Sequence, residues 1–109
     1  MFREQCQACR GDAAQVDTQT QKALLEQIPG WGIIAIDGIY RLTKSFQFPD
    51  FKQALTFSNK IGELAEASGH HPEIVTAWGK VTVSWWTHKI GGLHRNDFIA
   101  AAKTDRLYE

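Results

Sequence analysis

The sequence has no excess of charge of either sign, because twelve Lys and Arg residues balance twelve Asp and Glu residues in a chain of 109. A protein that binds nucleic acid by neutralising phosphates needs a basic surface, so we expect no nucleic-acid partner. No apolar run approaches the roughly 18 residues that cross a bilayer, so we expect no membrane span. The opening segment, MFREQCQACR, lacks the apolar core of a secretory signal. These absences favour a soluble protein of the cytoplasm.

Cysteine is scarce, and the two cysteines, Cys6 and Cys9, form one C-x-x-C pair. A zinc site of this type needs a second pair, and a redox site needs a strand before the motif and a helix after it. The polar segment around the pair offers neither. We interpret the pair as incidental, reduced and exposed, with a weak metal site or an oxidation-sensitive site as the alternative.

Motifs for covalent catalysis are also missing. No Ser or Cys lies in a recognisable nucleophile elbow, and Gly91 and Gly92 do not form a phosphate-binding loop. Without a nucleophile, metal motif or cofactor motif, the chemistry that remains is proton transfer, as in hydration, dehydration and isomerisation.

The periodic segments that are present predict one small domain. Residues 1–17 show no period and are expected to form a loosely ordered arm, and 18–109 to form the domain. Apolar residues three and four apart predict helices, and alternating runs bounded by glycine predict two hairpins. The expected helices cover 18–28, 51–68 and 94–108, and the expected strands cover 33–36, 39–48, 74–78 and 81–87. We expect Thr18 or Thr20 to cap the first helix.

The order α-β-β-α-β-β-α predicts an α+β fold, in which a four-stranded antiparallel sheet carries its helices on one face. The edges of such a small sheet favour pairing with another copy, so we expect a homo-oligomer.

The motif GHHPEI is unusual because it places His70 and His71 side by side in a chain that has four histidines. Glu66 precedes His70 by four residues, so the two share a helix face if the last turn persists. Pro72 fixes the direction of the chain just after His71.

A third histidine, His88, is expected to lie beside this motif. A two-residue turn at Gly79-Lys80 would pair Trp78 with Val81, and the same register would bring position 72 opposite Thr87. Glu66, His70, His71 and His88 would then converge at one rim of the sheet.

Three interpretations of this convergence compete. The histidines could be ordinary surface residues at a helix exit and a strand end. They could bind a metal, although adjacent side chains in extended backbone diverge to opposite sides and about four converging ligands are needed. They could transfer protons, since the imidazole pKa of about 6.5 suits an acid or a base near neutrality.

The spacing of these residues is similar to the signature of the pterin-4a-carbinolamine dehydratases. In that signature E-x(3)-H-H-P is followed by five residues and an aromatic, nine residues and a histidine, and eight residues and an aspartate. Here it corresponds to Glu66, His70, His71, Pro72, Trp78, His88 and Asp97. The resemblance extends upstream to GW at 30–31 and to F-x-F-x-DF at 46–51, and it covers roughly residues 20–105.

The resemblance implies an α+β homodimer or homotetramer that dehydrates 4a-hydroxytetrahydropterin to quinonoid dihydropterin without a metal or cofactor. It implies a role in recycling the pterin cofactor of phenylalanine hydroxylase, its functional partner. The segment KIGGLHRND is similar to the bacterial branch of the family.

The resemblance also suggests roles for individual residues. We expect His70 and His88 to act as acid and base, His71 to position the pterin ring, and Glu66 to orient His70 or to bind the polar edge of the pterin. The expected substrate-binding residues are Gly69, Pro72, Trp86, Thr87 and Lys89.

Several neighbouring residues have a structural interpretation instead. Asp97 is expected to cap the last helix from its third position, with His94 at the N-cap in place of the Ser or Thr that the family usually has. Trp78 is expected to lie in the core or at an interface. Trp85 and Trp86 are expected to face opposite ways, one of them into the core.

The alternative to an enzyme is a protein-interaction module. Some animal relatives serve as dimerisation cofactors of a transcription regulator, and the same fold can carry such a role. The complete set of histidines in this sequence favours the enzyme.

Overall fold

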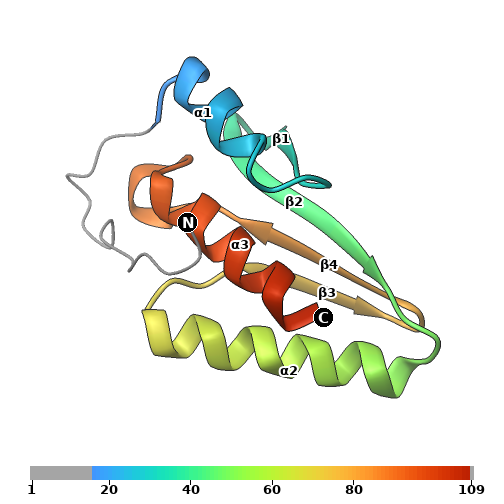
Figure 1. Cartoon of the computed structure of the whole chain (residues 1–109). Coiled ribbons are helices and arrows are strands. Elements are labelled where there is room, and N and C mark those ends of the chain that lie inside the picture. Colours follow the sequence, from blue (N-terminus) through green and yellow to red (C-terminus); the bar gives the residue numbers. More distant parts are fainter. Residues whose placement is uncertain (1–15, 109) are drawn as a thin grey trace.

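The computed structural model describes residues 16–108. Most of the predicted arm, including Cys6 and Cys9, lies outside the described residues. The described chain forms three α-helices and four strands in the order expected from the sequence (Figure 1). The elements are α1 (Thr18–Leu25), β1 (Gly32–Ile36), β2 (Ile39–Gln47), α2 (Phe51–Ser68), β3 (Glu73–Ala77), β4 (Lys80–Trp85), the short 3-10 helix η1 (His88–Ile90) and α3 (Arg95–Tyr108).

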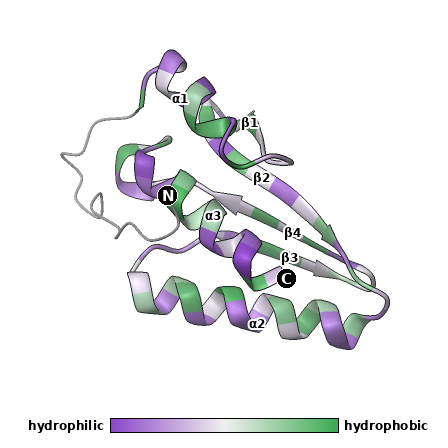
Figure 2. Ribbon diagram, viewed as in Figure 1, coloured by the Kyte–Doolittle hydropathy of each residue, from purple (hydrophilic) through white to green (hydrophobic). Residues whose placement is uncertain are grey.

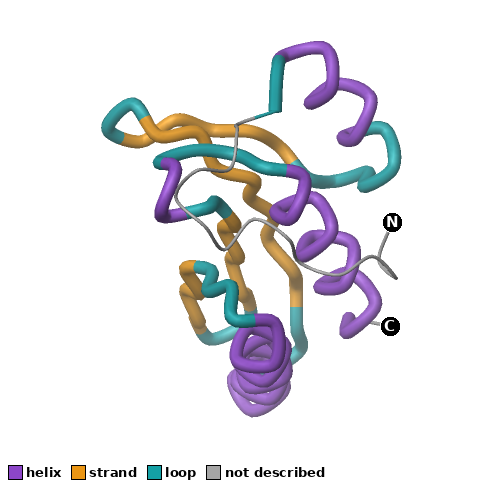
Figure 3. Tube along the Cα trace, turned by 90° about the vertical axis from the view of Figure 1, so that its left-hand side faces the viewer, coloured by secondary structure: helices purple, strands orange, loops and turns teal. Residues whose placement is uncertain are grey.

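The strands form one antiparallel sheet in the order β1-β2-β4-β3, so the two hairpins meet at the central β2–β4 pair. Alternating residues of these strands face α2 and α3, and the opposite, outer face of the sheet carries mostly polar side chains. Figures 1 and 3 show α2 and α3 running along the sheet, and Figure 2 shows hydrophobic residues recurring along α2, whose buried residues include Ala54, Phe57 and Ile61. The α+β prediction is confirmed.

The core lies between this inner sheet face and the helices. Trp85 is fully buried on β4, and its indole Nε1 donates to Thr104 Oγ1 on α3 at 3.0 Å. The other buried apolar residues of the sheet and of these helices include Leu42, Phe46, Val81 and Val83 on strands, Ala54, Phe57, Ile61 and Ala65 on α2, and Phe98 and Ala101 on α3.

The first helix starts at Thr18 as predicted, but its N-cap and its last residue differ from the prediction. Its N-cap is Asp17, whose carboxylate accepts from Thr20 N at 2.7 Å, so neither Thr18 nor Thr20 is the cap. The helix ends at Leu25 because bonds of 3-10 type follow, including one from Ile28 N to Leu25 O at 3.1 Å. This tighter turn brings Ile28 into the core.

The second hairpin turns one residue earlier than predicted. Trp78 and Gly79 form the turn, Ala77 pairs with Lys80, and Thr76 pairs with Val81 instead of Val83. The position of this turn is stabilised by the loop between β2 and α2, because Phe48 N donates to Gly79 O at 2.9 Å. The resulting shift of two residues leaves every side chain on its predicted face, so the alternating pattern could not reveal it.

Candidate active site

The end of α2 directs the two adjacent histidines. Gly69 adopts a left-handed conformation with φ of 66° and ends the helix, and His70 N then donates to Ala65 O at 3.2 Å. The chain leaves the helix axis at this glycine and enters β3 at Glu73. His70 and His71 therefore lie in a short extended link, where successive side chains point in different directions.

His70 turns inward and forms a buried pair with Asp97 of α3. His70 Nε2 lies 2.7 Å from Asp97 Oδ1, and only 7% of the His70 side chain and none of the Asp97 side chain is exposed. The imidazole stacks on Trp85 with a centroid distance of 5.3 Å and an angle of 19°. A carboxylate can only accept here, so the proton between the two groups belongs to His70 Nε2.

Asp97 joins three segments through its two oxygens. Besides His70, its Oδ2 accepts from Thr87 Oγ1 at 2.8 Å and from His94 N at 2.9 Å. The predicted cap of α3 is therefore confirmed. The contact with His70 was missed by our sequence reasoning, although the constant spacing of the aspartate in the family signature was a signal that could have indicated it.

His71 turns outward and pairs with Glu66. His71 Nε2 lies 2.8 Å from Glu66 Oε2, and both side chains are well exposed. Glu66 thus contacts His71, and the expected orienting contact with His70 is absent. The reason is the left-handed turn at Gly69, which ends the helical i, i+4 relation before His70.

His88 lies next to His71, as the sequence predicted. Its Nε2 is 3.0 Å from the backbone oxygen of His71, which joins the start of η1 to the helix exit. Its ring is exposed and lies 4.5 Å from the Trp86 ring at 39°. Because a carbonyl oxygen only accepts, His88 Nε2 carries a proton and Nδ1 is the acceptor of the neutral ring.

The predicted substrate-binding residues come from the same two segments. Gly69 and Pro72 flank the adjacent histidines, and Trp86, Thr87 and Lys89 flank His88. Lys89 is exposed, whereas Thr87 is buried with its hydroxyl on Asp97. The side chain of Thr87 therefore supports the site from behind, and its backbone N–H donates to Gly92 O at 2.8 Å.

Two of the tryptophan predictions have clear outcomes. Trp85 packs in the core, and Trp86 lies on the outer face of the sheet, so the prediction of opposite faces is confirmed. Trp78 is 71% exposed at the tip of the second hairpin, so it does not lie in the core, and the interface alternative stays a prediction. The turn at Trp78-Gly79 removes its side chain from both faces of the sheet.

His94 caps α3 with its ring. Its Nδ1 accepts from Asn96 N at 3.2 Å, which requires this nitrogen to be unprotonated. Burial lowers the pKa of His94 from its ordinary value of 6.5; the carboxylate of Asp97 opposes this shift, and the charge of His70 adds to it.

Because the pKa of His94 is lower in the folded protein than in the unfolded chain, its contribution to stability is complete above about pH 6.5. This contribution should be lost as the pH falls from there through the lowered pKa. Urea unfolding of the wild type and of His94→Ser from pH 8 to pH 5 measures the effect. The wild type should lose more free energy of unfolding than the variant, and parallel profiles would contradict the assignment.

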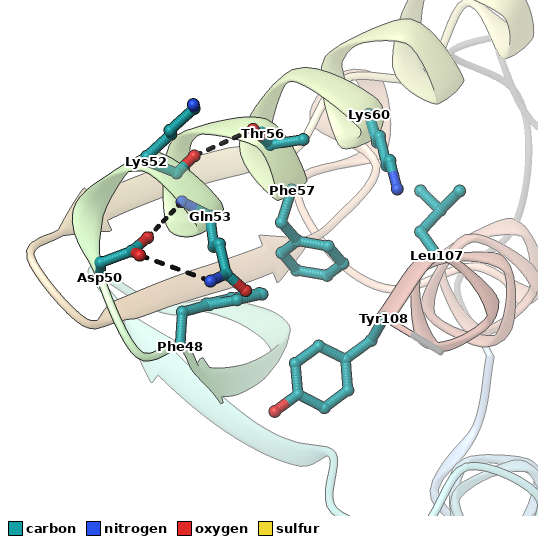
Figure 4. A pocket seen from close by; sticks show the side chains of 9 residues that line it. All are labelled: Phe48, Asp50, Lys52, Gln53, Thr56, Phe57, Lys60, Leu107 and Tyr108. Atoms are coloured by element: carbon teal, nitrogen blue, oxygen red, sulfur yellow. Dashed lines mark hydrogen bonds between the residues drawn. The ribbon is translucent and has the colours of Figure 1, made fainter.

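A pocket of about 490 Å³ lies elsewhere, between the start of α2 and the end of α3. Figure 4 shows its wall of Phe48, Phe57 and Tyr108 and the amine of Lys60 near Leu107. It contains none of the predicted site residues. Its lining on α2 ends at Lys60, so the last eight residues of the helix, about 12 Å, separate the pocket from the helix exit that carries the histidines.

Within residues 16–108, no group of three or more His, Cys, Asp or Glu side chains is arranged to hold a metal ion. No helix in the same range combines the length and the apolar character needed to span a membrane.

Comparisons with known proteins point to one family. The family described as "Pterin 4 alpha carbinolamine dehydratase" matches residues 14–107. A protein of Syntrophotalea carbinolica named "Putative pterin-4-alpha-carbinolamine dehydratase" is 54% identical over 100% of this chain and 97% of its own length. A protein of Marinobacter nauticus with the same name is 53% identical over 97% of this chain and 96% of its own.

A solved structure with the same fold is that of a transcriptional coactivator/pterin dehydratase from Brucella melitensis. It superposes with a TM-score of 0.79 at 29% identity, covering 88% of this chain and all of that one.

Proposed function

The chain belongs to the pterin-4a-carbinolamine dehydratase family and is thus a hydro-lyase, and we propose that its substrate is 4a-hydroxytetrahydrobiopterin. The product would be the quinonoid dihydropterin, and the reaction would proceed by acid–base catalysis at the histidines without a metal. The observation that carries this proposal is the direct link between two exposed histidines, His88 Nε2 on the backbone oxygen of His71, beside a buried His70–Asp97 pair.

The reaction needs one proton donor and one proton acceptor. The 4a-hydroxyl leaves as water when an acid protonates its oxygen and the C4a–O bond breaks. The lone pair of N5 then forms the C4a=N5 double bond, and a base removes the proton of N5. No electrons are gained or lost, so the two proton transfers account for the whole conversion. Each transfer by a positioned side chain typically contributes about 10²–10⁴-fold.

His71 and His88 are the pair best placed for these transfers. The Nε2 of each is held by an acceptor, Glu66 in one case and the His71 backbone oxygen in the other, so Nδ1 of each ring remains for the substrate. A protonated His71 would make a charge-assisted bond to Glu66, which suits the acid. Neutral His88 would accept the N5 proton at Nδ1 and act as the base.

His70 would support the site from within. Our sequence-based assignment made His70 one of the two proton-transfer groups, but its Nε2 faces buried Asp97 and its ring packs on Trp85. In the proposed site its role is therefore to hold the link that carries His71. The flat heterocycle would lie between backbone groups of Gly69 to Pro72 and of Trp86 to Lys89.

The wider context of the reaction is also proposed. The spent pterin would come from phenylalanine hydroxylase in a bacterial cytoplasm, and the chain would act as a homodimer or homotetramer. The exposed apolar side chains of the edge strands, Ile34 and Ile36 on β1 and Val75 on β3, are compatible with pairing between copies.

An assay of 4a-hydroxytetrahydropterin loss, coupled to phenylalanine hydroxylase and run with a chelator, tests the proposal. The protein should accelerate the loss equally with and without the chelator, because no step uses a metal. Acceleration that the chelator abolishes would contradict metal-free catalysis. No acceleration by folded protein would favour the interaction module instead, in keeping with the description of the Brucella melitensis protein as a transcriptional coactivator as well as a dehydratase.

A further inference from the structure

Arg41 lies over Trp86 on the outer face of the sheet. Leu42 pairs with Trp85, so one residue further the same register sets Arg41 opposite Trp86. Because Leu42 and Trp85 face the core, their neighbours face the other way. The guanidinium carbon of Arg41 is 4.0 Å from the centroid of the Trp86 ring, which is a close cation–π contact.

The Arg41 side chain also forms a long ion pair with Glu73 of β3. Its Nη1 is 4.0 Å from Glu73 Oε2, beyond hydrogen-bond distance, and its Nε is buried without a hydrogen bond. Only 12% of the side chain is exposed. Burying a charged group with few hydrogen bonds costs free energy, and the close contact with the indole offsets part of that cost beside the long ion pair with Glu73.

Trp86 also contacts the ring of His88, so it links Arg41 to this histidine. The rings of Trp86 and His88 are 4.5 Å apart, and Trp86 is itself almost completely buried, whereas the imidazole is exposed. His88 belongs to a 3-10 helix of three residues, which offers little support for its ring. Its orientation therefore depends on two contacts, the indole of Trp86 and the backbone oxygen of His71.

We propose that Arg41 is a positioning residue for the dehydration, which holds the Trp86 indole in place and through it the imidazole of His88. This inference rests on the proposed function, since the position of His88 matters to the reaction if that ring transfers a proton. The planar guanidinium suits the role because it covers the face of the indole, and a flexible ammonium would not. The signature residues do not include Arg41.

The test compares wild type with Arg41→Met, which keeps the length of the side chain and removes the charged plane. Two readouts are needed: the NMR signals of the His88 ring, identified by their loss in His88→Gln, and the kinetics of dehydration. In Arg41→Met the ring signals should move toward those of an unpacked histidine, because the ring current of the indole is no longer held over them. The kcat should fall about 10-fold, and KM should change less than about twofold. This loss in kcat is smaller than the ~10²-fold loss that follows from misplacing a catalytic group by about 1 Å, because the imidazole itself remains.

Glu73→Gln is the matched control, since it removes the carboxylate of the long ion pair and leaves the guanidinium on the indole; both readouts should stay at wild-type values. If Arg41→Met does not fold, Arg41→Lys should change both readouts in the same direction. An unchanged kcat, or a lowered kcat with unmoved His88 signals, would overturn the inference. Wild-type protein without activity would instead overturn the proposed function, and the His88 signals would still decide whether Arg41 holds the ring.

Discussion

Replacing His88 with alanine should lower kcat of the dehydration by about 10²- to 10⁴-fold, the contribution of a positioned general acid or base. The proposed base is the Nδ1 of this ring, and alanine leaves no group that could accept the proton of N5. The fold should survive, because the ring is exposed and contributes one hydrogen bond, to the backbone oxygen of His71, worth about 1 kcal/mol. Steady-state kinetics and urea unfolding measure the two effects separately.

Lys60→Ala serves as a control at a distance. Lys60 lies in the middle of α2 and lines the pocket rather than the histidine site, so its loss should leave the rate unchanged. Near-wild-type activity of His88→Ala would remove His88 from the reaction. A loss of activity in Lys60→Ala instead would move the site to the pocket of Figure 4.

Replacing Asp97 with alanine should lower the free energy of unfolding by about 3–5 kcal/mol, because each buried hydrogen-bond donor left without an acceptor costs about 1–3 kcal/mol. The change leaves His70 Nε2, Thr87 Oγ1 and His94 N without their acceptor, all at buried or partly buried positions. Since small domains are stable by only about 5–15 kcal/mol, this is a large share of the total. Urea unfolding at neutral pH measures it.

Asp105→Asn is the matched control for this prediction. Asp105 also accepts from other segments, from Lys44 Nζ at 2.9 Å and from Trp31 Nε1 at 3.1 Å, but the Lys44 pair is partly exposed and asparagine keeps an acceptor for the indole. Exposed and half-exposed pairs contribute about 0–1 kcal/mol, so the control should lose little stability. Equal losses in the two variants would show that burial of the Asp97 network does not add the expected stability.

Predictions from the sequence agree with the structure where the residues that decide a feature are close together in the chain. Local signals were read correctly where one neighbour decides the outcome: Gly69 ends α2, Asp37-Gly38 turns the first hairpin with positive φ at both residues, and the strands alternate as predicted. The N-cap of α1 also depends on a local signal, but our prediction of Thr18 or Thr20 was wrong because Asp17 is the cap. It depended on a carboxylate just outside the predicted helix.

The pairing of the site residues was harder to predict. Helical spacing suggested a contact of Glu66 with His70, yet Glu66 contacts His71, because the helix ends between them. Adjacent residues in extended backbone then diverge, and the direction of each was set by partners far away in sequence. His70 points inward because it pairs with Asp97, which is 27 residues away in sequence. No local sequence pattern predicts that contact.

The amino-acid sequence alone determined the α+β order of elements and the face of each strand, because periodicity and turn residues act over a few positions. It also predicted that Glu66, His70, His71 and His88 meet at one rim, although from a hairpin register that was wrong by two residues. Only the tertiary structure decided which histidine is buried and which is exposed, and that Arg41 lies on Trp86 beside His88. These outcomes depend on how β2, η1 and α3 pack around the end of α2. Burial and charge pairing are properties of that packed arrangement, which joins residues that are distant in the chain.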